Sequence, residues 1–394
     1  MTLRVAAHVD LRYTTRLPTG VDKHIARMVR GLAARPGFDV SVVAPRGQLE
    51  RGSLPEASSL HGLPVDPIPF SNRTGRLLWG VSDRLPIDRY CPGVDWVWSP
   101  QELWAPARHA RTAVTVHGST YFEPTYPGYN SAVARLERAR MGWFFRRICR
   151  SADLVLPVSH YLERFLIERF GLRPERSVVV GNGVDEVFFA AGAAAVATPR
   201  QREYDPDKLL VVGGLNDWDG VGSIMACADA LAESIPGVGI DVVGTLDHPG
   251  RLLDCDRRRN LRRLGFRTAK ELAEMMPGYL ALLYLPNVES FGIVALEAMA
   301  AALPVVACRL TAVPETAGDG AWYVDECRPD EVVAAVRALR ADPGLRSEWM
   351  ERGRRRATGF TWTSCVERLS RALQIVHGPE DSRAPGMPVV RTLP

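Results

Sequence analysis

Two glutamates, Glu289 and Glu297, flank the start of a predicted helix that follows a buried strand. Residues 279–285 form a continuous apolar run that predicts the strand, and residues 286–290 predict a turn at its carboxyl end. In open α/β sheets, ligands bind at the carboxyl ends of the strands. Carboxylates at this position can accept hydrogen bonds from the neighbouring hydroxyls of a sugar or a ribose.

The start of this helix predicts an anion site. We expect Ser290 to be the N-cap, and Phe291, Gly292 and Ile293 to open the helix. Helix N-termini present free backbone N–H groups to an anion, and glycine lets a ligand approach the backbone closely. A phosphate on the backbone and hydroxyls on the glutamates together describe a nucleotide sugar. The alternative is structural, because a capped helix with one surface glutamate gives the same pattern.

The rest of the chain alternates short apolar runs, which predict strands, with helical patterns. The predicted strands are residues 3–9, 39–44, 94–98, 112–117, 153–158, 177–180, 209–213, 239–244, 279–285 and 304–308. The predicted helices include residues 21–35, 221–234, 269–276 and 291–302. This alternation predicts an α/β protein of two Rossmann-like, doubly wound parallel-sheet domains.

The domain boundary is predicted near residues 185–205. Small residues at 191–195 and a polar stretch at 198–207 are typical of an exposed linker. We divide the chain into domains 1–185 and 186–360, followed by a helix over residues 361–376. Residues 377–394 hold prolines and charges without an apolar period, which predicts a disordered tail.

The composition narrows the class of protein. The 394 residues are 46% hydrophobic and 24% charged, and the net charge of +4 is too small for a nucleic-acid binder. The 7 cysteines are scattered without zinc spacing, which suits a reducing cytosol, where disulfides are rare. No apolar run approaches the roughly 20 residues that cross a bilayer, and no signal peptide is recognisable. We expect a soluble, cytoplasmic protein with no metal and no required cofactor.

Residues 289–297, Glu-Ser-Phe-Gly-Ile-Val-Ala-Leu-Glu, closely resemble the E-x7-E motif of the retaining GT-B glycosyltransferases of family 4. The resemblance continues in Asn-Gly-Val-Asp at 182–185, in the segment 313–320 and in Thr-Val-His at 115–117. It is more specific in the second half of the chain. It implies a GT-B fold, in which two domains face a central cleft. The first domain binds the acceptor, the second binds the nucleotide sugar, and the last helix crosses back to the first.

The resemblance also implies roles for single residues. Glu289 would hold the hydroxyls of the donor sugar, Glu297 would bind the ribose, and His117 would face the reacting centre. The N–H groups of Phe291 and Gly292 would face the sugar and the diphosphate. The donor-binding residues that it implies are Gly20, Gly214, Ser290, Phe291, Gly292, Ile293 and Glu297. Apart from the resemblance, a lone histidine is more often a hydrogen-bonded core residue.

The sequence departs from the family pattern at two positions. Family members carry an arginine and a lysine after the first strand of the second domain, where this chain has Gly214 and Asp219. These cations neutralise the diphosphate as it leaves, and one lost donor typically costs roughly 2.7–4 kcal/mol. Another basic residue, a divalent ion on Asp217 or Asp219, or a weak or inactive enzyme would each explain the change. We favour another basic residue; the candidates are Arg16, Lys23, Arg251 and Arg309.

The first half carries the aromatic residues Trp79, Trp96, Trp98, Trp104, Tyr121, Phe122, Tyr126 and Tyr129. Because sugars stack on aromatic faces, Tyr121–Tyr129, just after His117, is a candidate acceptor loop, with core packing as an equal alternative. Residues 132–150 interleave arginines with aromatic residues. Such a helix either packs its aromatic face inward or lies on an anionic membrane, as for a lipid-linked acceptor, and we favour inward packing.

The sequence therefore predicts a retaining glycosyltransferase with a UDP-, GDP- or dTDP-sugar donor. The expected acceptor is a hydroxyl of a cell-surface glycan or glycolipid precursor, or of a small natural product. One alternative is a relative that binds nucleotide sugar as a regulatory protein without turnover. A weaker alternative is a nucleotide-sugar epimerase, which would release free sugar.

Overall fold

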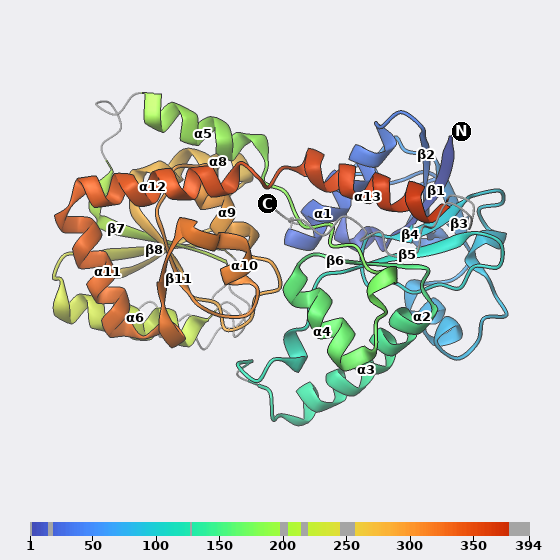
Figure 1. Ribbon diagram of the computed structural model, residues 1–394, viewed down its shortest axis with the longest axis horizontal. Helices are drawn as coiled ribbons and strands as arrows, with labels where there is room; N and C mark the ends of the chain where they lie inside the picture. The colour runs from blue at the N-terminus through green and yellow to red at the C-terminus, as the bar shows by residue number, and fades with distance from the viewer. Residues whose placement is uncertain are drawn as a thin grey trace. The chain divides into compact units, whose positions relative to one another are not determined.

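The computed structural model describes residues 2–14, 19–126, 128–197, 204–213, 220–244 and 257–377, with only the backbone of Gly80 and Val81. The chain forms two compact units (Figure 1). Unit 1 comprises Met1–Gly118, Leu136–Gly183 and Trp362–Pro394. Unit 2 comprises Ser119–Arg135 and Val184–Thr361. In this division, the last helix therefore belongs with the N-terminal part of the chain.

Unit 1 contains a six-stranded parallel sheet in the order β3-β2-β1-β4-β5-β6. Its strands are β1 (Leu3–His8), β2 (Phe38–Pro45), β3 (Val65–Ile68), β4 (Trp96–Ser99), β5 (Arg111–Val116) and β6 (Leu154–Pro157). The helices are α1 (Gly20–Ala33), α2 (Asn72–Val81), α3 (Ala132–Ser151), α4 (His160–Phe170) and α13 (Trp362–His377). The first four residues of α3 count with unit 2.

Unit 2 contains a second six-stranded parallel sheet in the order β12-β11-β10-β7-β8-β9. Its strands are β7 (Asp205–Val212), β8 (Gly239–Val243), β9 (Leu261–Gly265), β10 (Tyr279–Tyr284), β11 (Val305–Cys308) and β12 (Ala321–Val324). The helices are α5 (Glu186–Ala197), α6 (Val221–Ser234), α8 (Ala269–Met275), α9 (Ile293–Ala300), α10 (Val313–Ala317), α11 (Pro329–Ala341) and α12 (Pro343–Ala357).

The two sheets have the same topology. Counted along the chain within each unit, the strand order is 3-2-1-4-5-6 in both. This is the doubly wound order, and the direction of winding reverses between β1 and β4 in unit 1 and between β7 and β10 in unit 2. The prediction of two Rossmann-like parallel-sheet domains is therefore confirmed.

The strands are apolar because helices cover both faces of a doubly wound parallel sheet. The core of unit 1 joins alternate residues of β1 and β2 to the inner face of α1 and to Cys365, Val366 and Leu369 of α13. Helix α13 packs closely on α1: a Cβ on Gly31 would lie 2.5 Å from a methyl carbon of Val366. This packing makes the last helix part of the first core (Figure 1).

The predicted linker is wrong where it falls on described residues. Residues 186–197 form α5, which packs in unit 2. A Cβ on Gly192 would lie 2.0 Å from the carbonyl oxygen of Ala300, so the small residues serve close helix packing with α9. Residues 198–203 lie outside the described part of the chain.

Residues 177–180, a predicted strand, form an irregular segment at the edge of the first sheet. Val178 and Val180 donate backbone hydrogen bonds to the carbonyls of Val155 and Pro157 in β6. The segment thus covers the sheet edge without forming a regular strand. Strands β3, β9 and β12 lack strong apolar runs, and the sequence does not predict them; β3 and β9 carry polar residues because they are edge strands.

Unit 2 holds a cysteine pair that the sequence pattern does not predict. Cys308, at the end of β11, forms a disulfide with Cys327, with 5.1 Å between their Cα atoms. The sheet brings together two residues that lie 19 positions apart. His377 is the last residue of α13 and so is not part of a tail, while residues 378–394 lie outside the described residues. Within the described residues, no helix is long and apolar enough to span a membrane.

Candidate active site

Glu289 lies in the loop after β10, the strand at the point of reversal in the second sheet. Its Oε1 atom accepts hydrogen bonds from the backbone N–H groups of Ser290 and Phe291, at 2.9 and 3.0 Å. Its Oε2 atom accepts a hydrogen bond from the hydroxyl of Tyr284. Its own N–H donates to the hydroxyl of Thr311 at 3.0 Å. The half-buried carboxylate is therefore held by its own strand and loop.

The helix after this loop begins later than the sequence pattern predicts: α9 starts at Ile293, and Gly292 is its N-cap. The predicted N-cap, Ser290, is buried in the loop. Gly292 has φ +99°, a conformation that favours glycine, whereas a Cβ at this position would lie 3.8 Å from its nearest neighbours. Backbone conformation, and not lack of space, therefore requires glycine at this position.

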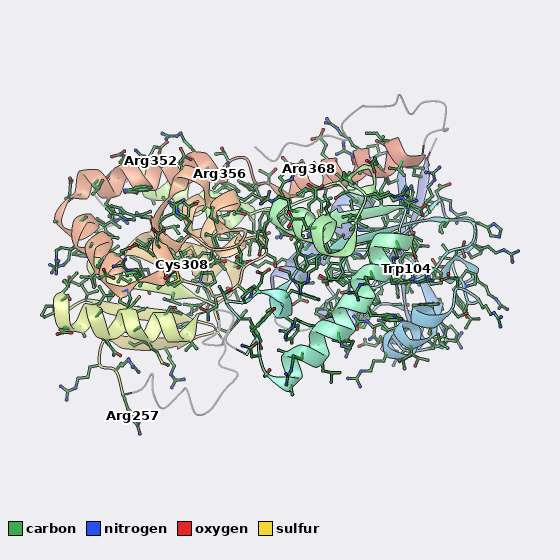
Figure 2. All side chains as sticks on the ribbon, turned by 60° about the horizontal axis from the view of Figure 1, so that its bottom comes forward. Trp104, Arg257, Cys308, Arg352, Arg356 and Arg368 are labelled. Carbon is green, nitrogen blue, oxygen red and sulfur yellow. A yellow bond between two sulfur atoms is a disulfide. The ribbon has the colours of Figure 1, made fainter. Side chains whose placement is uncertain are left out.

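Phe291 links the loop to the end of α12. Its buried ring packs edge-to-face on Phe360, with 6.0 Å between the ring centroids. Figure 2 labels Arg356, which lies on α12. Its guanidinium lies 4.9 Å from the centroid of the Phe360 ring and donates to the carbonyls of Thr316 and Glu315 at 2.9 and 2.6 Å. The loop that carries Glu289 thus rests on α10 and α12.

Glu297 is the fifth residue of α9 and is 2% exposed. It lies only about one turn from the start of α9, because the helix begins at Ile293. Ile293 is half-buried. Glu297 is thus a buried carboxylate on the helix that follows the Glu289 loop.

His117 follows directly after β5, at the carboxyl edge of the first sheet. Its Nε2 atom donates to the carbonyl of Pro100 at 2.9 Å, and its backbone N–H donates to the carboxylate of Glu102 at 2.5 Å. Because a carbonyl can only accept, the proton of the neutral ring is on Nε2. The Nδ1 atom is then the acceptor of the ring.

His24, on the buried face of α1, is a candidate site residue that sequence reasoning missed. Its ring makes an edge-to-face contact with that of His117, with 4.6 Å between centroids. Its Nδ1 atom is 2.8 Å from the Oδ1 atom of Asn182, in the Asn-Gly-Val-Asp segment. Burial, and secondarily the neighbouring His117, lower the pKa of His24 well below its ordinary value. The only sequence signal for His24 is its helical spacing from Met28.

Gly20 is the first residue of α1 and is exposed. The preceding residue, Thr19, caps the helix together with Asp22 in a capping box. Of the basic candidates for the diphosphate, Lys23 is half-buried in the first turn of α1. Arg309 lies 4.4 Å from the ring centroid of Tyr323 and 3.6 Å from a carboxylate oxygen of Asp325.

Several predicted site positions lie outside the described residues: Arg16, Gly214, Asp217, Asp219 and Arg251. Within the described ranges, no group of three or more His, Cys, Asp or Glu side chains is arranged to hold a metal ion.

The aromatic candidates for the acceptor site divide into two groups. The four tryptophans belong to the core of unit 1 or line it; they are Trp79, Trp96, Trp98 and Trp104, each 4% exposed or less. The segment 120–129 counts with unit 2, and its Tyr121 and Tyr126 rings are half-buried. In this segment the hydroxyl of Thr125 donates to the carbonyl of Asn287 at 2.6 Å, next to the Glu289 loop.

Family models match most of the chain. The model described as Glycosyltransferase Family 4 matches residues 18–188, and the model described as Glycosyl transferases group 1 matches residues 198–356. The chain belongs to glycosyltransferase family 4. It is therefore a transferase enzyme, and the strand order of its two sheets is that of the GT-B fold.

Related family members differ in what they act on. The chain is 24% identical to glycogen synthase of Mycobacterium tuberculosis, over 97% of both chains. It is 27% identical to phosphatidyl-myo-inositol mannosyltransferase of Mycolicibacterium smegmatis, over 93% of this chain and 92% of the relative.

Solved structures of similar fold include sucrose-phosphate synthase from Thermosynechococcus elongatus, with a TM-score of 0.70, 16% identity and coverage of 94% of this chain and 98% of that one. HepE from Anabaena in complex with UDP-glucose has a TM-score of 0.65, 17% identity and coverage of 94% and 99%.

Proposed function

We propose that this family 4 glycosyltransferase moves a hexosyl-type sugar, with retention at the anomeric carbon, from a nucleotide-diphosphate sugar to a hydroxyl acceptor. The observation that carries the proposal is the placement of Glu289. Its carboxylate lies at the carboxyl end of β10, in the loop before α9, and accepts three hydrogen bonds there. Donor hydroxyls can replace these intramolecular donors one for one.

The donor is a UDP-, GDP- or dTDP-sugar. Glu297 supports a ribose contact, because its buried carboxylate stands on the helix that follows the Glu289 loop. HepE binds UDP-glucose, which makes this compound the first donor to test. The N–H of Phe291 donates to Glu289 in this structure, and we propose that the phosphate binds at the start of α9, beside Gly292 and Ile293, where the helix dipole also favours an anion.

In this mechanism Glu289 positions the sugar and is not a nucleophile. The acceptor hydroxyl attacks the anomeric carbon on the face from which the diphosphate leaves, and the leaving phosphate takes the acceptor proton. His117 presents its Nδ1 atom as a hydrogen-bond acceptor, with its Nε2 proton engaged by Pro100. We assign Gly20, Gly214 and Ser290 to the same donor site through the family pattern.

The charge of the leaving diphosphate needs a cation that the family pattern places where this chain has Gly214 and Asp219. We propose that Arg16, Lys23, Arg251 or Arg309 supplies it. Substitution of each by glutamine, with steady-state kinetics in the presence and absence of Mg²⁺, identifies the residue. Loss of activity in one variant, unaffected by Mg²⁺, supports this assignment; activity that requires Mg²⁺ assigns the role to an ion.

The acceptor is a hydroxylated glycan, a glycolipid precursor or a small natural product, and the protein acts in the cytoplasm. A lipid-linked acceptor is supported by exposed apolar side chains on neighbouring helices of unit 1, namely Leu77 and Leu78 on α2 and Leu136 and Trp143 on α3. The ion pair between Asp83, just after α2, and Arg147 joins the two helices. Co-sedimentation with phosphatidylglycerol vesicles, lost in Leu77→Ser/Trp143→Ser, tests this peripheral contact.

A panel of nucleotide sugars tests the proposal as a whole. We expect slow donor hydrolysis by the wild type, faster turnover with an acceptor, and loss of both in Glu289→Ala. The proton spectrum of the product reports retention at the anomeric carbon. Tight nucleotide binding without turnover, with or without Mg²⁺, would instead support a regulatory protein, the alternative that Gly214 and Asp219 favour. Release of a free sugar epimer would support an epimerase.

A further inference from the structure

Unit 1 contains a buried group of polar side chains that the donor site does not use. We call it the β1–β4 polar cluster; it consists of His8, Asn72, Arg76 and Ser99, to which we add Gln101, two residues further along the chain from Ser99. His8 ends β1 and Ser99 ends β4, the two neighbouring strands between which the direction of winding reverses. The cluster therefore lies where open α/β sheets bind ligands.

Hydrogen bonds within the cluster satisfy only some of its polar atoms. The Nε2 atom of His8 lies 3.2 Å from the Oδ1 atom of Asn72, and its Nδ1 atom lies 3.4 Å from the hydroxyl of Ser99. The contact with His8 uses the oxygen of the Asn72 amide, and neither contact involves the amide nitrogen. That Nδ2 atom is buried without a hydrogen-bond partner, and Asn72 as a whole is 4% exposed.

Arg76 stands one turn after Asn72 on α2, on the same face of the helix. Its Nε atom is also buried without a partner, and its guanidinium lies 5.7 Å from the centroid of the Phe144 ring. None of the ion pairs between described residues involves Arg76, and its Nη2 atom donates to the backbone carbonyl of Glu102 at 3.5 Å. Burial, and secondarily the positive charge of Arg140, lower the pKa of Arg76, while the carboxylates of Glu102 and Asp10 act in the opposite direction.

Gln101 lies two residues beyond Ser99 and is 3% exposed. Both atoms of its amide, Oε1 and Nε2, are buried without a partner. Buried polar atoms without partners cost folding free energy, and a bound water, ion or functional role can account for them. In the cluster, three nitrogen donors and one oxygen acceptor are unpaired, from Asn72, Arg76 and Gln101.

We propose that the β1–β4 polar cluster binds a small hydroxylated compound through an anionic group, a phosphate or a carboxylate. The excess of N–H donors and the positive charge of Arg76 select the anion, and the Gln101 amide oxygen accepts from a hydroxyl. The compound is the polar head of the acceptor, an identification that rests on the proposed function. The cluster and the donor loop belong to different units of the chain.

Calorimetric titration of the full chain, without nucleotide, tests the proposal. Each charged probe is compared with its uncharged parent. Glucose 6-phosphate and glucuronate are compared with glucose, inositol monophosphate with inositol, and glycerol 3-phosphate and glycerate with glycerol. We expect at least one charged member to bind and its uncharged parent to bind about tenfold to a hundredfold more weakly, as for a hydrogen-bonded charged group. The phosphate and carboxylate arms distinguish the two anions.

Arg76→Gln is the first variant, and Arg73→Gln, at an exposed position of the same helix, is its matched control. We expect Arg76→Gln to weaken binding of the charged probe about tenfold or more and Arg73→Gln to leave it unchanged. Gln101→Glu, which places a negative charge in the cluster, serves as a second variant if Arg76→Gln does not fold.

Equal binding of charged and uncharged probes, or wild-type affinity in both Arg76→Gln and Gln101→Glu, overturns the inference. UDP binding is measured in parallel on the same preparations. If UDP binds and no charged probe binds, the anion site is rejected and the proposed function is not. Binding of a charged probe that depends on Arg76, without turnover of any nucleotide sugar, supports the anion site and rejects the proposed function.

Discussion

The carboxylate of Glu289 accepts a hydrogen bond at 3.0 Å from the backbone N–H of Phe291, two residues further along the chain. The same Oε1 atom accepts from the N–H of Ser290. The loop is thus closed by hydrogen bonds to its own glutamate. A donor sugar that binds Glu289 must exchange these contacts for its own hydroxyls, so the affinity of the donor reflects a difference between two sets of hydrogen bonds.

Glu289→Gln should retain the fold and lose most transferase activity. Glutamine keeps one oxygen acceptor, but its NH2 group cannot accept from a sugar hydroxyl or from the hydroxyl of Tyr284. We expect kcat/KM to fall by about a hundredfold, the scale of one charged hydrogen bond lost in the transition state. Glu274→Gln, at an exposed position of α8, is the control. Equal kcat/KM in both variants would contradict the role of Glu289.

Tyr284→Phe should have a smaller effect than Glu289→Gln. The hydroxyl of Tyr284 donates to Oε2 of Glu289, and its removal leaves the two backbone donors in place. The loss of one hydrogen bond of about 1 kcal/mol predicts a change of roughly fivefold in kcat/KM. Steady-state kinetics measure it. A loss as large as that of Glu289→Gln would show that Tyr284 itself contacts the donor.

Gly292→Ala should destabilise unit 2 by about 1–2 kcal/mol, because alanine is strained at φ +99°. Gly222→Ala, inside α6 with open space around its Cβ position and no positive φ, is the matched change. It should stabilise by about 0.4–1 kcal/mol. Urea unfolding of both variants gives the two free energies. A stabilising effect of Gly292→Ala would contradict the left-handed N-cap.

Acid should destabilise the folded protein over a pH range that is set by the pKa values of its buried histidines. Burial lowers the pKa of His8 from 6.5 to about 4, and burial also lowers the pKa of His24. Because the folded-state pKa is below the unfolded value, the unfolded chain binds the proton more readily. The stability of the folded state is therefore fully present above pH 6.5 and is lost as the pH falls from about 6.5 towards 4.

Replacement of His8 by glutamine tests this pH dependence. The shift in the pKa of His8 corresponds to about 3 kcal/mol of unfolding free energy across this pH range, as an order of magnitude. The slope of the unfolding free energy against pH, measured by urea titration between about pH 7 and 4, should decrease in His8→Gln. His61→Gln, at an exposed position, is the control. An unchanged slope in His8→Gln would assign the acid sensitivity to other groups.

Helices and strands with a strong hydrophobic period agree well with their predictions. Helix α6 begins and ends where the sequence pattern places it, and β1, β8 and β10 agree to within one residue. The predicted linker is the clearest failure. The small residues around Gly192 resemble a linker in sequence, but in the structure they allow α5 to contact α9. Composition does not distinguish a residue that is small for flexibility from one that is small for packing.

The sequence by itself determined the alternation of strands and helices, the two parallel sheets and the position of the Glu289–Glu297 motif, because these depend on hydrophobic period and local turn chemistry. Tertiary structure decided which distant side chains meet. His24 contacts Asn182, 158 positions away, and lies against His117; Cys308 pairs with Cys327; α13 completes the core of unit 1. These contacts follow from strand order, which places remote strand ends side by side, and no local pattern encodes it.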